Sequence, residues 1–469
     1  MNRIVASARD GSIILFHFGG RGTIDLVTGV VRGLQQRGFC FVTLSELYGW
    51  KKMVRGGDSG PGAAAPSLRH VFAEGTTRPG FEEWLLVLNP NDVPVTVRAG
   101  YHAAGGSLER EYEIPARRRI SVNVNGEVPW KDDVSMVLES SLPVVAERSV
   151  FFNRGANFGG GSVSRGAEEC SRTWYFPEGS VKSGFEEYLA VFNPARETAL
   201  LRVAFHGEGG EAGVVEREVG PLSRLTLRVN DRVPEGDYSA VVRSSEPVAV
   251  ERSQYFLYGG FCAGSSCSPG TTRPAARHYF AEGTTRERFD SYLSLHNPCG
   301  HDTWVLVRMH VSDGSLREER LALGAGERRT MRLDTCLPPD RDYSLTVLSL
   351  LPVAVERSVY FLSHNLAGGF CDAGVREASG SWYFAEGSTR PGFTQWLAVF
   401  NPNARQEVAR VTYICGEEAV EREYLIPPGQ RVTVAVGSEV GERDEVAMVV
   451  SCDGGILAER SLYFDHAMP

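Results

Sequence analysis

Residues 383–387 spell Tyr-Phe-Ala-Glu-Gly, and close copies of this segment occupy residues 279–283, 175–179 and 71–75. The phenylalanines of successive copies are 104 residues apart each time. Each copy is followed by a second conserved segment, Glu-Arg-Ser, which lies at residues 147–149 in the first copy. A repeat this regular indicates one module copied four times, so no residue inside the repeat is expected to form a unique active site.

The strands expected in each module are short and separated by turn residues. An apolar segment at residues 81–88 ends in Asn89-Pro90, and the Asn-Pro pair recurs in the other three copies. The segment is too short for a helix and rich in β formers, which predicts a core strand whose Asn side chain caps the turn. Further along, Ile120, Val122 and Val124 alternate with polar residues, a pattern typical of a half-buried strand.

These patterns predict an all-β fold class with four tandem immunoglobulin-like β-sandwich modules, and a small barrel is the second choice. The 52 glycines and 24 prolines of the 469-residue chain are consistent with this turn-rich class. The predicted modules are residues 69–152, 173–256, 277–361 and 381–464, with a linker at residues 53–68. Glycine-rich stretches between modules either act as flexible linkers or wrap back onto the preceding sandwich, and the expected shape is a string of four beads.

Charge and hydropathy exclude two classes of partner. The formal net charge is −9, which argues against nucleic-acid binding. No apolar run reaches the roughly 18–20 residues that a membrane span needs. The oligomeric state cannot be read from the sequence.

Acidic residues recur with the module. One series begins with Glu74 in the first copy of the Tyr-Phe-Ala-Glu-Gly segment, which we call the opening segment. Another begins with Glu147 in the Glu-Arg-Ser segment, which we call the closing segment and in which an arginine follows each glutamate. Paired carboxylates can act as acid and base in glycoside hydrolysis, but four such sites in one array would be unusual. We expect these acids to cap turns or to pair with Arg148 and its counterparts, and the remaining alternative is repeated ligand or Ca²⁺ contacts.

Nine cysteines leave their pairing open. Cys415 with Cys452, and Cys299 with Cys336, each lie within one module and could form disulfides, or all four could be buried free thiols. No Cys-x-x-Cys pair and no Cys/His cluster has the spacing of a zinc site, so no structural metal is expected.

The repeated segments resemble a repeat found in tandem in large secreted and cell-wall-associated bacterial proteins. The resemblance covers residues 69–464 and is carried by Tyr-Phe-Ala-Glu-Gly-(Ser/Thr)-Thr-Arg-Pro-Gly-Phe, Asn-Pro and the closing Glu-Arg-Ser. This repeat has no assigned activity of its own and often accompanies enzymes that act on cell walls or glycans.

The first 52 residues are of a different kind. Residues 11–17 have the pattern of a buried strand, residues 23–37 show helical spacing with Gly38 as the stop, and residues 39–47 resemble a second strand. A strand–helix–strand unit is part of a parallel sheet. About forty residues cannot bury both faces of such a sheet alone, so this unit needs neighbouring strands.

Residues 8–50 resemble the carboxyl end of the NodB-type polysaccharide deacetylases, metal-dependent enzymes that remove N-acetyl groups from glycans. Because that family has a distorted (β/α) barrel, the resemblance implies that residues 1–52 are a short strand–helix–strand remnant of such a barrel. The family's final Leu-x-His motif is matched by Leu15-Phe16-His17. The resemblance implies that Leu15 lines the acetyl-methyl pocket and that His17 is the general acid, a role that suits imidazole near neutral pH.

The metal-binding motifs of that family lie upstream of Leu-x-His, and they are absent from this sequence. We therefore expect no metal or other cofactor in this chain, and a divalent metal such as zinc only in a longer parent protein. The expected function is a non-catalytic β-sandwich array at the C-terminal end of a deacetylase-like envelope protein. The alternative is a stand-alone stalk, adhesin or weak glycan-binding surface protein. Either way the expected location is extracellular or in the cell envelope, with a cell-wall or extracellular glycan as partner.

Overall fold

The computed structural model describes residues 2–9, 11–16, 23–41, 52–155, 158–363 and 366–468. Its contacts divide the chain into two compact units. The larger unit is Val54–His466, and the smaller is Met1–Met53 with Ala467–Pro469.

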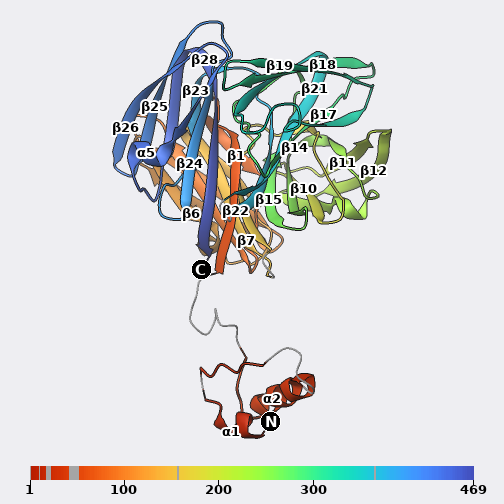
Figure 1. Ribbon diagram of the computed structural model, residues 1–469, viewed down its shortest axis with the longest axis vertical. Helices are drawn as coiled ribbons and strands as arrows, with labels where there is room; N and C mark the ends of the chain where they lie inside the picture. Colours follow the sequence, from red (N-terminus) through yellow and green to blue (C-terminus); the bar gives the residue numbers. More distant parts are fainter. Residues whose placement is uncertain are drawn as a thin grey trace. The chain divides into compact units, whose positions relative to one another are not determined.

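Four copies of one seven-stranded module make up the larger unit (Figure 1). Module 1 contains β2 (Ser67–Phe72), β3 (Phe81–Asn89), β4 (Val95–Ala103), β5 (Gly106–Ile114), β6 (Arg118–Asn123), β7 (Ser135–Asn153) and β8 (Gly159–Arg165). Module 2 contains β9 (Ser171–Phe176), β10 (Phe185–Asn193), β11 (Ala199–Gly207), β12 (Gly210–Val219), β13 (Ser223–Arg228), β14 (Ser239–Tyr258) and β15 (Cys262–Pro269). Module 3 contains β16 (Ala275–Phe280), β17 (Phe289–His296), β18 (Thr303–Val311), β19 (Leu316–Leu323), β20 (Arg328–Arg332), β21 (Tyr343–Ser363) and β22 (Leu366–Ala373). Module 4 contains β23 (Ser379–Phe384), β24 (Phe393–Phe400), β25 (Glu407–Cys415), β26 (Glu418–Ile426), β27 (Arg431–Ala435), β28 (Ala447–Met468) and, from the other end of the chain, β1 (Lys52–Pro61).

One long strand organises each module by belonging to two layers. In module 1 the first half of β7 pairs with β2 and β4, and its second half pairs with β3 and β8. β5 and β6 extend the two layers as edge strands. Apolar side chains such as Leu85, Val97 and Met136 fill the space between the layers. The same pairing occurs in the other modules, so the predicted tandem β-sandwich fold is confirmed.

The buried asparagine of each Asn-Pro pair fixes the turn after the second strand. The side-chain amide of Asn89 donates to the carbonyls of Val93, Ile114 and Pro115 at 2.9, 3.1 and 3.0 Å. Its Oδ1 accepts the backbone N–H of Asn91 at 2.9 Å. The same bonds recur at Asn193, Asn297 and Asn401. One buried amide thus satisfies several carbonyls that the turn would otherwise leave unpaired, as the sequence predicted.

Short helical turns follow the fifth strand in modules 1, 2 and 4. These are α4 (Val124–Glu127), the 3₁₀ turn η1 (Val229–Asp231) and α5 (Val436–Val440). The alternation that includes Val124 therefore continues one residue beyond the end of β6 and into α4, where Val124 remains fully buried.

Strand β1 completes module 4 and corrects the predicted linker. In modules 1 to 3 the seventh strand follows the long strand, whereas the partner of β28 is β1, about 400 residues upstream. Arg55 pairs with Asp465 at 3.0 Å, and the hydroxyls of Ser59 and Ser461 are 2.9 Å apart. The prediction that residues 53–68 form a linker is therefore wrong. The string of four beads is wrong as well, because the modules form one unit.

Glycine permits the seventh strands of the four modules to meet. Gly56, Gly160, Gly264 and Gly368 occupy the same position of β1, β8, β15 and β22. A Cβ added to Gly160 would lie 3.1 Å from the Cα of Gly264, and one added to Gly264 would lie 3.3 Å from the Cα of Gly368. A Cβ on Gly368 would lie 3.1 Å from the Cα of Gly56. Backbones approach this closely only where no side chain intervenes, so the glycine-rich stretches are core strands of a closed ring.

The described residues of the smaller unit include two helices, α1 (Asn2–Ser7) and α2 (Thr23–Gln36). The predicted helix is confirmed, and Gly38 follows it with a φ of +86°, as a glycine stop requires. The predicted strands are not: residues 11–16 and 39–41 have no strand structure, and residues 17 and 42–47 lie outside the described residues. The described part of this unit is a small helical cluster, and the barrel remnant stays a prediction.

Candidate functional site

The residues implied by the deacetylase resemblance lie in the smaller unit. Leu15 is 79% exposed, while its neighbours Ile14 and Phe16 pack against Ala8, Val30 and Leu34. His17 lies outside the described residues. Their catalytic roles stay predictions.

A cycle of buried ion pairs joins the four modules. The closing-segment arginine of each module pairs with the closing-segment glutamate of the next, and the last pair returns to module 1. The pairs are Arg148–Glu251 at 3.1 Å, Arg252–Glu356 at 2.7 Å, Arg357–Glu459 at 3.0 Å and Arg460–Glu147 at 2.8 Å. All eight residues are at most 3% exposed. The prediction that these acids pair with the repeated arginines is confirmed, and each pair crosses a module boundary.

Each buried pair is further satisfied by the opening segment. At the first boundary Glu251 accepts the backbone N–H of Glu74 at 2.7 Å, and Arg148 donates to the carbonyl of Glu74. The Glu74 carboxylate in turn pairs with Arg224 of module 2 at 2.7 Å. Buried charges are tolerated only with such compensation, so the repeated acids and arginines hold the ring together.

A small cavity lies between the four seventh strands. It measures about 50 Å³ and is lined by residues that include Asp58, Asp372, Cys267, Cys371 and Arg460. A cavity of this size holds about three water molecules and no sugar ring. Within the described ranges no group of three or more His, Cys, Asp or Glu residues could hold a metal ion.

Two carboxyl groups in this cavity have strongly shifted pKa values. Burial raises the pKa of Asp58 to about 7, although its carboxylate accepts the backbone N–H of Val163 at 2.7 Å. Burial raises the pKa of Asp372 well above its usual value, and the nearby charge of Asp58 adds to this effect. The Asp372 Oδ2 accepts from Arg357 at 2.9 Å, whereas Oδ1 has no hydrogen-bond partner in the described structure. Burial therefore favours the neutral form of both carboxyl groups.

A second pair of buried acids lies on the second strands of modules 1 and 2, with Glu83 on β3 and Glu187 on β10. Burial raises the pKa of Glu83 and of Glu187 to about 8. Glu83 Oε2 accepts the backbone N–H of Thr76 at 2.7 Å, while Oε1 has no partner among the described residues. Gln395 occupies the same position in module 4. A neutral side chain thus fits this position, and protonated glutamates are the corresponding state in modules 1 and 2.

All nine cysteines are free. The sulfur atoms of Cys267 and Cys371 each lie 3.0 Å from an arginine of the ring, Arg148 and Arg252 respectively. Of the two sequence alternatives for Cys415 and Cys452, the structure has buried free thiols.

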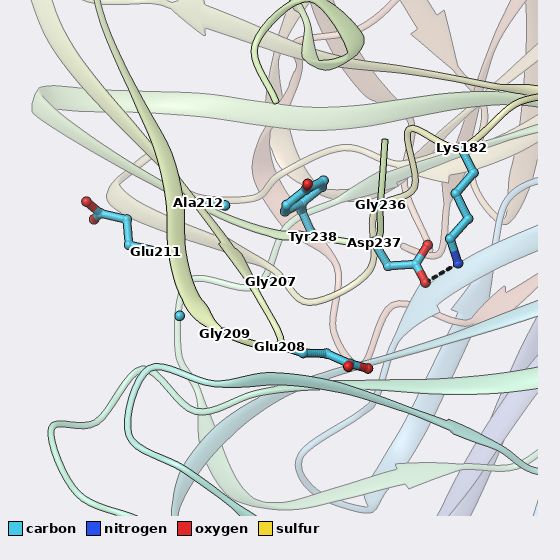
Figure 2. A pocket seen from close by; sticks show the side chains of 10 residues that line it. Lys182, Gly207, Glu208, Gly209, Glu211, Ala212, Gly236, Asp237 and Tyr238 are labelled. Carbon is cyan, nitrogen blue, oxygen red and sulfur yellow. Dashed lines mark hydrogen bonds and ion pairs between the residues drawn. The ribbon is translucent and has the colours of Figure 1, made fainter. Parts of the chain in front are cut away.

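An open pocket of about 520 Å³ lies in module 2 between the β11–β12 hairpin and the loop before β14 (Figure 2). The hairpin residues Gly207–Ala212 line it on one side, and Gly236–Tyr238 with Lys182 line it on the other. Lys182 Nζ pairs with Asp237 at 2.6 Å. In Figure 2 the ring of Tyr238, the side chain of Glu208 and this ion pair surround the hollow. Sequence reasoning missed this pocket, because no repeated motif marks it.

Comparison with known proteins adds no function. Residues 55–253 match the model of a family described as a family of unknown function (DUF5719). No curated protein matches the chain. Among the described helices, none combines the length and apolarity of a membrane span.

Three solved structures illustrate the structural similarity. The chain is 17% identical to Thermotoga maritima 1070, with 22% of this chain and 96% of that one covered and a TM-score of 0.21. It is 24% identical to the Anabaena sensory rhodopsin transducer, with coverages of 17% and 92% and a TM-score of 0.16. A glycoside hydrolase family 32 protein from Bifidobacterium adolescentis is 8% identical, with coverages of 85% and 98% and a TM-score of 0.15.

Proposed function

We propose that the four-module unit is a non-catalytic scaffold of a secreted or cell-surface protein. One observation carries this proposal: every closing-segment carboxylate is buried and bonded to a guanidinium of the adjacent module. Glycoside hydrolysis requires two carboxyl groups that reach the substrate, and these carboxylates are at most 3% exposed. The repeated charges therefore stabilise the ring.

The partner we propose is a cell-wall or extracellular glycan. The resemblance of residues 69–464 to repeats of wall-associated proteins supports this choice, and the open pocket of module 2 offers a surface for a small polar ligand. The resemblance of residues 8–50 supports a deacetylase-like parent, in which any zinc would be held by motifs that this chain lacks. A stand-alone stalk or adhesin is the alternative.

The test measures retention and chemistry on the same glycans. The purified chain is mixed with insoluble chitin or peptidoglycan, and the bound fraction and the released acetate are measured with and without Zn²⁺. We expect retention without acetate release. Zinc-dependent acetate release that disappears in the His17→Ala variant would contradict the non-catalytic proposal, and absence of retention on every glycan would favour the stalk alternative.

A further inference from the structure

In three of the four modules a side chain packs on the hairpin that joins the third and fourth strands, and we call this side chain the cover of the hairpin. The cover comes from the loop that precedes the long strand. In module 1 the ring of Trp130 lies on the hairpin, and a Cβ added to Gly105 would be 2.5 Å from that ring. In module 3 Arg341 pairs with hairpin residue Asp313 at 3.6 Å. In module 4 Arg443 pairs with Glu418 at 2.6 Å.

In module 2 only the base of the hairpin is covered, where a Cβ added to Gly207 would lie 3.5 Å from the ring of Tyr238. The loop of module 2 reads Val-Pro-Glu-Gly-Asp at residues 233–237, one residue shorter than Val-Pro-Trp-Lys-Asp-Asp at residues 128–133. Glu235 takes the place of Trp130 and is exposed. Gly209 and Gly210 are retained in the hairpin, yet a Cβ added to either would meet nothing within 4 Å. The surface that receives an indole ring in module 1 is therefore open in module 2, where the 520 Å³ pocket lies.

The side chains that cover the hairpins of modules 1, 3 and 4 indicate which chemical groups would fit the open hairpin of module 2. Trp130 is a flat ring, whereas Arg341 and Arg443 are cations bound to hairpin carboxylates. In module 2, Glu208 has no ion-pair partner among the described residues, while Asp237 is already paired with Lys182. The ring of Tyr238 borders the same hollow (Figure 2). A complementary ligand combines a ring that has an apolar face with a positive charge.

We infer that this pocket binds an amino sugar, a pyranose ring that carries a protonated amine. The pyranose ring of the sugar lies on the Gly209–Gly210 backbone beside the side chain of Tyr238, and its amine faces Glu208. This inference rests on the proposed glycan-binding function and assigns that function a site and a class of sugar.

An arginine side chain of a partner protein is the competing occupant. The pocket volume of about 520 Å³ favours the sugar, because it lies within the range of roughly 300–1,000 Å³ that is typical of small-molecule sites and far exceeds one guanidinium. The aromatic ring and polar rim also match a ligand that has both apolar faces and hydroxyl groups.

The experiment titrates the full chain with a glucosamine tetramer and an N-acetylglucosamine tetramer by isothermal calorimetry. The glucosamine tetramer is expected to bind about tenfold more tightly, because acetylation removes the charge that Glu208 recognises. Glu208→Gln is expected to remove this preference. Glu235→Trp should fill the hollow as Trp130 does in module 1 and abolish binding.

Glu442→Trp is the matched control. Glu442 is the exposed counterpart of Glu235 in module 4, where Arg443 already covers the hairpin, so binding should not change. Unchanged thermal unfolding midpoints establish that each variant is folded.

The outcomes separate the site from the function. Unchanged glucosamine binding in Glu235→Trp, equal affinity for both tetramers, or binding of an arginine-rich peptide without binding of either tetramer overturns the site. Retention on chitin or peptidoglycan with any of these results leaves the proposed function intact. Absence of both retention and tetramer binding overturns both.

Discussion

Replacing Glu83 by glutamine should stabilise the protein at neutral pH and leave its stability at low pH unchanged. Glu83 is fully buried, and burial raises the pKa of its carboxyl from the usual 4.5 to about 8. Gln395 occupies the equivalent position in module 4, so the fold already accommodates the amide there. The substitution copies a side chain that the chain uses elsewhere.

The magnitude follows from linkage between proton binding and folding. Between pH 4.5 and 8 the carboxyl is protonated in the folded state and ionised in the unfolded state. The unfolded state therefore binds fewer protons, and the free energy of unfolding falls by about 1.4 kcal/mol per pH unit as pH rises. Across the roughly 2.5 units up to pH 7, Glu83 costs about 3 kcal/mol, and glutamine removes that cost.

The assay is urea denaturation of the wild type and of Glu83→Gln at pH 5, 6, 7 and 8. The difference in the free energy of unfolding should grow from under about 1 kcal/mol at pH 5 to about 3 kcal/mol at pH 7. Glu109→Gln, at an exposed position on β5, is the control and should change stability by less than about 0.5 kcal/mol. Equal stabilisation at pH 5 and pH 7, or none at pH 7, would refute the reasoning.

Three further predictions test the ring. Arg252→Ala should cost about 3–5 kcal/mol in denaturant unfolding because it leaves Glu356 buried without its partner, and replacing both residues by methionine should recover most of this loss; equal losses would contradict the pairing argument. Gly264→Ala should destabilise by about 1–3 kcal/mol, since its Cβ would clash at the ring axis, whereas Gly209→Ala meets open space and should have little effect; similar effects of both would argue against close packing of the seventh strands. The backbone amides of residues 52–61 should exchange with deuterium as slowly as those of other core strands, and exchange at loop rates would show that β1 does not pair.

The sandwich modules could be predicted from the sequence because their signals are local. Alternation of apolar residues, the Asn-Pro turns and the 104-residue period each act within one module. Asn89 illustrates this, since all its hydrogen-bond partners lie in module 1. Local patterns are sufficient where local contacts decide the structure.

Ring closure could not be predicted from local composition. Residues 53–62 are rich in glycine and resemble a linker, but their pairing partner lies about 400 residues downstream. The repeat itself held a usable signal: Gly56-Gly57 lies 104 residues before Gly160-Gly161, which marks it as a copy of the same strand. Extending the period upstream of the first Phe-Ala-Glu-Gly segment would have identified β1.

The cycle of ion pairs was predictable only in part, because its pairs also join residues that are far apart in the sequence. The sequence showed that Glu147 and Arg148 recur together, but adjacent residues on a strand point to opposite faces and do not pair with each other. Their true partners, Arg460 and Glu251, belong to the flanking modules. The open pocket of module 2 arises because no side chain covers Gly209 and Gly210 of its hairpin. Only a comparison of the folded modules reveals this difference.

Placing the first and last strands of the ring side by side sets how it responds to mechanical load. Arg55 faces Asp465 and Ser59 faces Ser461, so β1 and β28 run antiparallel and their free ends leave from the same edge. A force that pulls these ends apart loads the bonds in sequence and peels the strands from one side, without shearing all of them together. This first step removes β1 from module 4, while modules 1 to 3 keep all seven of their strands. A protein under tension would therefore yield at this seam before those three modules are strained.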